Sequence, residues 1–220
     1  MMMKPDFDRA AVKAAETLVK YNVCSFPVDP LPLLKAIKGV SVYSFSEMSE
    51  SIGVKRSDLL ATFRNSQDAT CSVDYEDGKK RYMVVYNEKL SRCLQKRALA
   101  RELGHIILGH DGTLPFEVRE AEAKCFAHHL LSPRALIHTI KATGIRFTLE
   151  VFNNLTECNE RCLECMRAIP ETHVPAELNR QIRNNFMDYI VNFFDCQHMF
   201  SASDSTAIAY LGSYMDGYEE

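Results

Sequence analysis

Residues 98–110 read ALARELGHIILGH, a pattern typical of a helix with one buried side. Its apolar side chains recur at i, i+4, i+7 and i+8, the spacing of one buried stripe on an α-helix: Leu99, Leu103, Ile106 and Ile107. On a neighbouring face, positions 101 and 105 lie one turn apart. The stretch therefore predicts a helix over about residues 91–109 that packs its apolar side into a core and carries a polar edge.

The patterns along the rest of the chain predict a mostly helical α+β fold. Asp77-Gly78, flanked by alternating side chains, is typical of a β-hairpin turn. Periodicity and turn residues place the other expected helices at about 6–21, 31–38, 116–131, 133–142, 148–154, 157–168 and 175–194, the strand at 40–45 and the hairpin at 69–87. A linker could fall near residues 143–147.

The composition is that of a soluble globular protein. The chain has 220 residues, 46% hydrophobic side chains and a formal net charge of −3, which gives no general reason to expect nucleic-acid binding. No run approaches the roughly 18 apolar residues of a membrane span, and the first residues lack the apolar core of a secretory signal. We therefore expect a cytoplasmic protein, whose 8 cysteines are thiols or metal ligands rather than disulfides.

Residues 101–105 differ by one letter from a zinc-binding helix. The pattern H-E-x-x-H places two imidazoles one turn apart, with a carboxylate beside the first that can accept a proton from metal-bound water. Glu102 and His105 match this pattern, whereas its first position holds Arg101. A guanidinium has no lone pair at any accessible pH, so Arg101 cannot be a metal ligand. On these letters alone, the simpler interpretation is a core helix with a charged edge.

A second stretch, FEVREAEAKCFAHHLLSP at 116–133, also carries a recognisable motif, because Glu-Ala, Phe-Ala and Leu-Leu-x-Pro stand in it at fixed spacings. RELGHIILGH and this stretch together resemble the ImmA/IrrE family of zinc metallopeptidases, whose blocks run roughly H-E-L-G-H-x-x-L-G-H and E-A-N-x-F-A-x-x-L-L-x-P. The matching residues are Glu102, Leu103, Gly104, His105, Leu108, Gly109 and His110, then Glu122, Ala123, Phe126, Ala127, Leu130, Leu131 and Pro133. The resemblance covers most of residues 5–195. It implies a zincin-like domain over 1–142, with a small β-sheet packed on the metal-site helices, a helical C-terminal subdomain over 143–200 and a polar tail over 201–220.

The resemblance also implies a site and a function. In it, Glu102 is the general base, while His105 and Glu122 are ligands of a zinc ion. Similar proteins act on protein or peptide substrates, among them helix-turn-helix repressors encoded beside them. The segment VPAELNRQIRNNF is similar to one found in members from phages and mobile elements. The implied partner is thus a protein, with no nucleic acid and no membrane.

Two departures from the family pattern bear on the metal. Arg101 replaces the first histidine ligand, and Lys124 replaces the asparagine that follows Glu-Ala. Two protein ligands would hold zinc poorly in a site built for three. Other histidines are poor substitutes, because His110 would project about 140° away around the helix and His129 lies about two turns from the acidic ligand position.

Because of these departures, we predict a charge partner for Arg101 and consider two alternative functions for the protein. We predict that the Arg101 guanidinium pairs with Glu122, and also with Glu102, so that it replaces the positive charge of zinc. One function is a zinc-dependent endopeptidase. The alternative is a catalytically inactive relative that binds a regulatory protein without hydrolysing it.

A cysteine cluster offers a second metal-site hypothesis. Cys158, Cys162 and Cys165 have the C-x-x-x-C-x-x-C spacing of a radical S-adenosylmethionine loop, but only 55 residues follow Cys165 in this chain of 220, too few for the barrel of that family. The same three residues fall on one stripe of an expected helix, where they are most simply core thiols. With Cys196, they could instead hold a structural metal ion.

Overall fold

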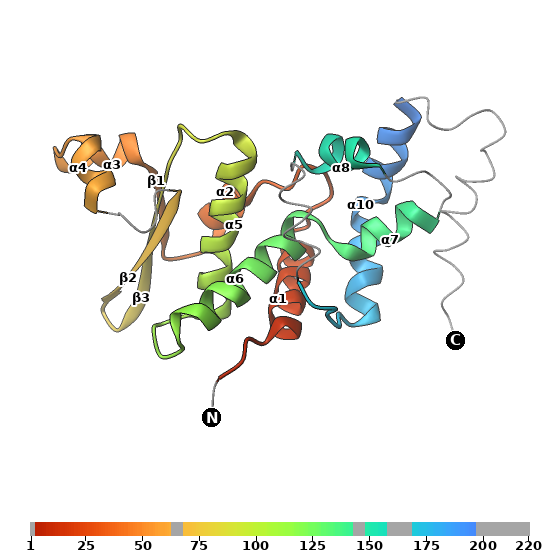
Figure 1. Ribbon diagram of the computed structural model, residues 1–220, viewed down its shortest axis with the longest axis horizontal. Helices are drawn as coiled ribbons and strands as arrows, with labels where there is room; N and C mark the ends of the chain where they lie inside the picture. The colour runs from red at the N-terminus through yellow and green to blue at the C-terminus, as the bar shows by residue number, and fades with distance from the viewer. Residues whose placement is uncertain (1–2, 63–67, 143–147, 158–168, 197–220) are drawn as a thin grey trace. The chain divides into compact units, whose positions relative to one another are not determined.

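The computed structural model describes residues 3–62, 68–142, 148–157 and 169–196 (Figure 1). The chain divides into two compact units. Residues up to Ala10 with Asp29–His128 form the first, and Ala11–Val28 with the residues from His129 onward form the second. Two helices, α1 (Phe7–Lys20) and α6 (Phe116–Leu131), contribute residues to both units. The predicted division into a domain over 1–142 and a helical subdomain over 143–200 stays a prediction.

A three-stranded sheet lies in the first unit, in the order β1-β3-β2. Strand β1 (Val40–Ser44) runs parallel to β3 (Lys79–Tyr86), while β2 (Ala69–Glu76) pairs with β3 in the antiparallel sense. Asp77 and Gly78 join β2 to β3 with φ values of 51° and 70°. Two consecutive left-handed residues match the twist of a two-residue hairpin, which confirms the predicted turn.

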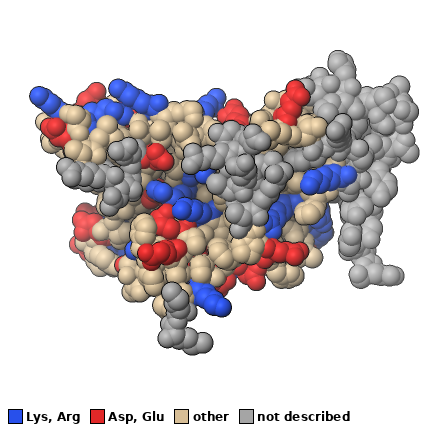
Figure 2. All heavy atoms as spheres, viewed as in Figure 1, with Lys and Arg blue, Asp and Glu red and all other residues tan. Residues whose placement is uncertain are grey.

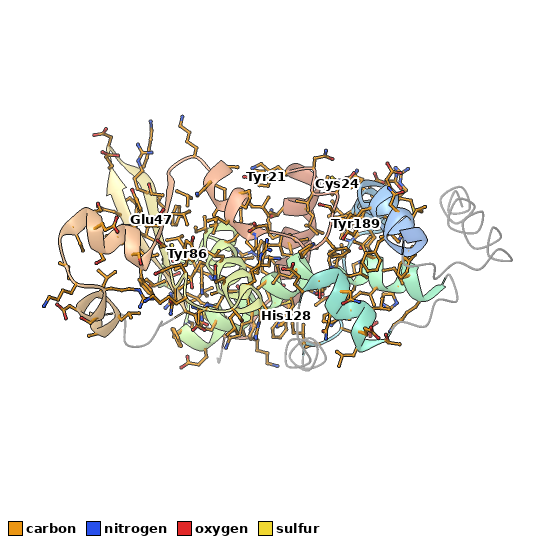
Figure 3. The ribbon with its side chains drawn as sticks, turned by 90° about the horizontal axis from the view of Figure 1, so that it is seen from above. Tyr21, Cys24, Glu47, Tyr86, His128 and Tyr189 are labelled. Carbon is orange, nitrogen blue, oxygen red and sulfur yellow. The ribbon has the colours of Figure 1, made fainter. Side chains whose placement is uncertain are left out.

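Two short helices follow β1 and were not predicted: α3 (Phe45–Ile52) and α4 (Arg56–Thr62). A capping box starts α3, because the Ser44 hydroxyl accepts the Glu47 N–H while the Glu47 carboxylate accepts the Ser44 N–H. Figure 3 labels Glu47 on this helix. Gly53 ends the helix in the left-handed conformation, and Phe45, Leu59 and Val85 form a core cluster with the sheet. The spacing Ser-x-x-Glu before this helix was thus a sequence signal of its start.

Three further helices cover the rest of the first unit. Helix α2 (Pro30–Ala36) starts at Asp29, whose carboxylate accepts the Leu31 N–H, and α5 (Arg92–Leu108) ends at the left-handed Gly109. Helices α5 and α6 confirm the two long helices that the sequence predicted (Figure 1). They approach closely at Gly104, where an added Cβ would lie 3.1 Å from the Phe126 ring and 3.2 Å from the Ala123 carbonyl oxygen. This close approach brings the polar edge of α5 next to α6.

The second unit is helical in the part that the structure describes. It contains α7 (Arg134–Ala142), α8 (Leu149–Thr156) and α10 (Ala176–Cys196), all of which the sequence predicted. The Phe26 and Phe186 rings pack with their centroids 4.9 Å apart, and Tyr189 of α10, labelled in Figure 3, also contacts Phe26. The buried core of this unit includes Leu136, Ile140, Phe152, Leu155, Phe186, Ile190 and Phe194. A mostly helical α+β fold is thus confirmed.

Several predictions fall wholly or partly outside the described residues, among them the linker near residues 143–147. The expected helix at 157–168, which carries Cys158, Cys162 and Cys165, lies there except for its first residue, as does the polar tail at 201–220. Cys196 is the last residue of α10, and its side chain is not described. The structural metal hypothesis for these cysteines therefore stays a prediction. Within the described ranges, no helix is long and apolar enough to cross a bilayer.

Candidate functional site

A cavity of about 390 Å³ opens in the first unit where α5 and α6 face strand β2. Residues of five segments line it: Thr70, Cys71, Val73 and Tyr75 from β2; Tyr82 from β3; Arg101, Glu102, His105 and Ile106 from α5; His110–Gly112 after α5; and Arg119 and Glu120 from α6. The polar edge of α5 that the sequence predicted thus faces this cavity. Burial raises the pKa of Cys71 to about 12, so this thiol stays protonated and is a poor nucleophile or metal ligand.

Arg101 forms ion pairs with two carboxylates at this cavity. Its Nη2 donates to Glu102 Oε1 at 2.7 Å and to the Ala69 carbonyl at 3.1 Å, and its Nη1 lies 3.7 Å from Glu120 Oε2. The Arg101 side chain is 23% exposed and that of Glu102 is 5% exposed, so the pair is largely shielded from water. Burial raises the pKa of Glu102, and the charge of Arg101 opposes that rise. The predicted pairing of Arg101 with Glu102 is confirmed.

His105 links this ion pair to a second polar group. Its Nε2 lies 3.0 Å from Glu120 Oε1, and its Nδ1 lies 2.8 Å from Nδ1 of His110. His110 Nε2 in turn lies 3.0 Å from Glu122 Oε2. With both carboxylates ionised, all three bonds can form only if the two imidazoles together hold three protons, one more than two neutral rings. Burial lowers the pKa of His110, and the hydrogen bond with His105 lowers the pKa of Glu120.

Glu122 lies at the far end of this network and not beside Arg101. It accepts the Asp6 N–H at 2.8 Å, contacts His110, and lies 3.7 Å from Arg9 Nη1. The predicted pairing of Arg101 with Glu122 is therefore wrong, and Glu120 is the carboxylate of α6 that faces Arg101 and His105. The two acids are two residues apart, so they project about 200° apart around the helix and cannot both face the same residues of α5.

The position of His110 also differs from the expectation, because its side chain lies beside that of His105. A continued helix would have turned it away from His105, but α5 ends at Leu108 and the left-handed Gly109 folds the chain back. The two histidine rings consequently stand 5.0 Å apart between centroids. His129 belongs to the second unit, where its Nε2 lies 3.0 Å from the Thr172 hydroxyl, and Lys124 is exposed to solvent.

A family model matches the part of the chain that forms this site. Residues 54–160 match the model of the IrrE N-terminal-like domain, Peptidase_M78, a match that includes every lining residue of the cavity. The chain carries an IrrE N-terminal-like domain. The resemblance to the ImmA/IrrE metallopeptidases is thereby confirmed, and the chain has a metallopeptidase-like domain. No curated protein and no solved structure matches the chain significantly.

The side chains of this IrrE-like domain do not fit a three-ligand zinc site. His105 and Glu120 could each offer a lone pair, but Arg101 stands at the position of the missing imidazole, and its guanidinium holds Glu102. Among the residues that the structure describes, no group of three or more histidine, cysteine and acidic side chains could hold a metal ion. A cation added to this cluster would meet the charge of Arg101 at close range.

Glu120 is the site residue that the sequence interpretation missed. The letters EAEA at 120–123 offer two acids, and the family pattern was aligned to the second of them. Both are partly or fully buried, so burial alone does not separate their roles. The choice depends on which side of α6 meets α5, and that side follows from the close approach at Gly104.

Proposed function

We propose that this IrrE-like domain is a non-hydrolysing relative of the zinc metallopeptidases, which binds a segment of another protein in the cavity beside β2. The observation that supports the proposal is the ion pair of Arg101 with Glu102 and Glu120. A guanidinium supplies positive charge to both carboxylates, as a metal would, but it cannot polarise a carbonyl or activate water by coordination. The domain can then keep its fold and its cavity without hydrolysing peptides.

The edge strand β2 offers a surface for such a segment. In the described part of the sheet, β2 pairs with β3 on one side only, so its other edge is available to a further strand. Val73 and Tyr75 line the cavity and are 40% and 62% exposed, so a bound segment could contact both side chains. An extended peptide could pair with this edge through main-chain hydrogen bonds and place side chains against Val73 and Tyr75.

The charge distribution favours a protein partner over nucleic acid. Acidic and basic side chains lie interspersed on the face shown in Figure 2, whereas a phosphate backbone is bound by a continuous basic surface. The resemblance suggests a regulatory protein such as a helix-turn-helix repressor as the partner. Zinc-dependent hydrolysis of that partner is the alternative that the experiments must distinguish.

Metal content tests the proposal most directly. The unaltered protein and the variants Arg101→His and Arg97→His are purified and dialysed against zinc. The zinc content of each is measured by mass spectrometry, and its peptidase activity is assayed in parallel. Arg97 lies one turn earlier on α5 and is half-buried like Arg101, so its variant controls for an added imidazole. We expect about one zinc ion per chain only in Arg101→His, because only this change restores a third ligand. Stoichiometric zinc and hydrolysis in the unaltered chain would refute the proposal.

Peptide-binding measurements test whether the cavity beside β2 binds a segment of another protein. A panel of short unstructured peptides, including segments of helix-turn-helix repressors, is titrated by fluorescence polarisation. We expect Val73→Asp to abolish the binding of any peptide that the unaltered chain binds, because a charge would face the docked strand. Ile52→Asp is the matched control, since Ile52 is 47% exposed but belongs to α3 and does not line the cavity. Equal loss in both variants, or no binding at all, would contradict this docking mode.

A further inference from the structure

A second cavity, of about 660 Å³, lies within the second unit. It opens between the first residues of α7 and of α10, and residues 172–174 complete its wall. Small-molecule sites in proteins usually measure about 300–1,000 Å³. This cavity therefore has the size of a site for one small molecule, and all of its lining residues lie outside the peptidase-like cluster described above.

Three arginines give this cavity a positive field. They are Arg134, Arg180 and Arg183, and among the described lining residues Glu177 is the one carboxylate. Glu177 pairs with Arg180 through two bonds of 2.9 and 3.0 Å, which compensates one positive charge. Arg134 donates to the neutral Ile169 carbonyl at 3.2 Å and forms no ion pair with a carboxylate of the described residues, so none of these balances its charge.

Arg183 carries the second uncompensated charge. It makes no hydrogen bond or ion pair with any residue in the described ranges, although it is only partly exposed. A planar guanidinium has five donors, and a ligand in the cavity could accept from several of them in place of water. An anionic ligand would satisfy these donors and balance the charges of Arg134 and Arg183 together.

Other polar groups of the lining are also suited to an anion. His129, His138 and His173 contribute imidazoles, and Thr172 contributes a hydroxyl that lies 3.0 Å from His129 Nε2. The cavity meets α7 and α10 at their first residues, where main-chain N–H groups carry partial positive charge. A metal ion would be poorly suited, because uncompensated guanidiniums would repel it.

We propose that this cavity binds a small phosphorylated molecule. Phosphate has several oxygens that accept from the forked donors of more than one arginine, a geometry that lysine does not offer, and every basic residue in the lining other than histidine is arginine. The proposal goes beyond the peptide-binding function, since it concerns different residues in the other unit. Its outcome does not depend on whether the first cavity holds zinc.

Calorimetry with sodium pyrophosphate tests this site on the full chain at low ionic strength. We expect saturable binding that Arg183→Gln weakens about tenfold or more, because a charged hydrogen-bonding partner is lost. Lys20→Gln is the matched control: it removes the same charge from the same unit but lies outside the cavity, so it should leave the affinity unchanged. His138→Glu, at an exposed position of the lining, should weaken binding by placing a carboxylate beside the ligand.

Three outcomes would overturn the proposal. The first is the absence of saturable pyrophosphate binding by the unaltered chain. The second is an equal loss of affinity in Arg183→Gln and Lys20→Gln, which would indicate general charge attraction. The third is tighter binding of citrate than of pyrophosphate, which would assign the cavity to carboxylates. Thermal melts of each variant identify any that fail to fold, and His138→Glu then serves as the independent test of the cavity.

Discussion

Replacing Arg101 by methionine tests whether the guanidinium holds the buried carboxylate of Glu102 in the folded protein. Methionine keeps the length and apolar stem of the side chain but removes its charge and its donors. Glu102 would then lose the 2.7 Å hydrogen bond to Arg101 Nη2, while it stays 95% shielded because its side chain is only 5% exposed. A buried carboxylate without a partner either stays charged at high cost or takes up a proton.

The magnitude follows from the burial of the pair. Removing one partner of a buried ion pair costs about 3–5 kcal/mol, and we expect about 3 kcal/mol at pH 8, because Arg101 is 23% exposed and water relieves part of the loss. The folded-state pKa of Glu102 is already raised by burial and would rise further in the variant. An acid with a raised folded pKa destabilises the protein at high pH. The deficit should therefore shrink as the pH falls through that pKa, by up to about 1.4 kcal/mol per pH unit.

Urea unfolding at pH 8 and pH 5 measures both effects. Arg97→Met, on the same helix, controls for the loss of a charge and of helix surface. The double variant Arg101→Met/Glu102→Gln should recover most of the lost stability, since a neutral amide no longer needs the guanidinium. Two results would show that the pair has no energetic coupling. One is an Arg101→Met protein as stable as the parent at pH 8; the other is an equal loss of unfolding free energy from Arg101→Met whether residue 102 is glutamate or glutamine.

Two further changes test the packing that positions the site. Gly104→Ala should cost about 1–2 kcal/mol despite its better helix propensity, because the new Cβ would lie 3.2 Å from the Ala123 carbonyl oxygen and the main chain of α6 would have to shift. A higher melting temperature would contradict this. Ser44→Ala should cost about 1 kcal/mol by removing the N-cap of α3, whereas the exposed Ser51→Ala should change the unfolding free energy by less than about 0.5 kcal/mol. Equal effects of the two serine changes would argue against the cap.

Features set by neighbouring residues could be predicted well. The hairpin follows from Asp77-Gly78, since both residues tolerate the left-handed conformation that joins twisted strands. The limits of α5 follow from its apolar spacing and from Gly109. Helix α3 was missed although its capping box is also local, because the pattern of apolar residues over eight positions is too short to stand out.

Pairings between distant segments could not be predicted. The parallel pairing of β1 with β3 joins Val42 to Val84, and nothing near either residue specifies the partner strand. The acid that faces His105 is another example. Glu120 and Glu122 are both glutamates within two positions of each other, and the sequence analysis placed Glu122 beside His105, whereas the structure places Glu120 there. His110 returns to the site only because the chain reverses after the end of α5.

By itself, the sequence determined that an imidazole is missing at position 101, because a guanidinium lacks a lone pair in any fold. It also determined the helices that carry the polar residues, because helical periodicity is a local property. Which carboxylates pair with Arg101 became clear from the packing of the helices. That choice depends on the rotation of α6 against α5, and the rotation is set by the contact of Gly104 with Ala123 and Phe126.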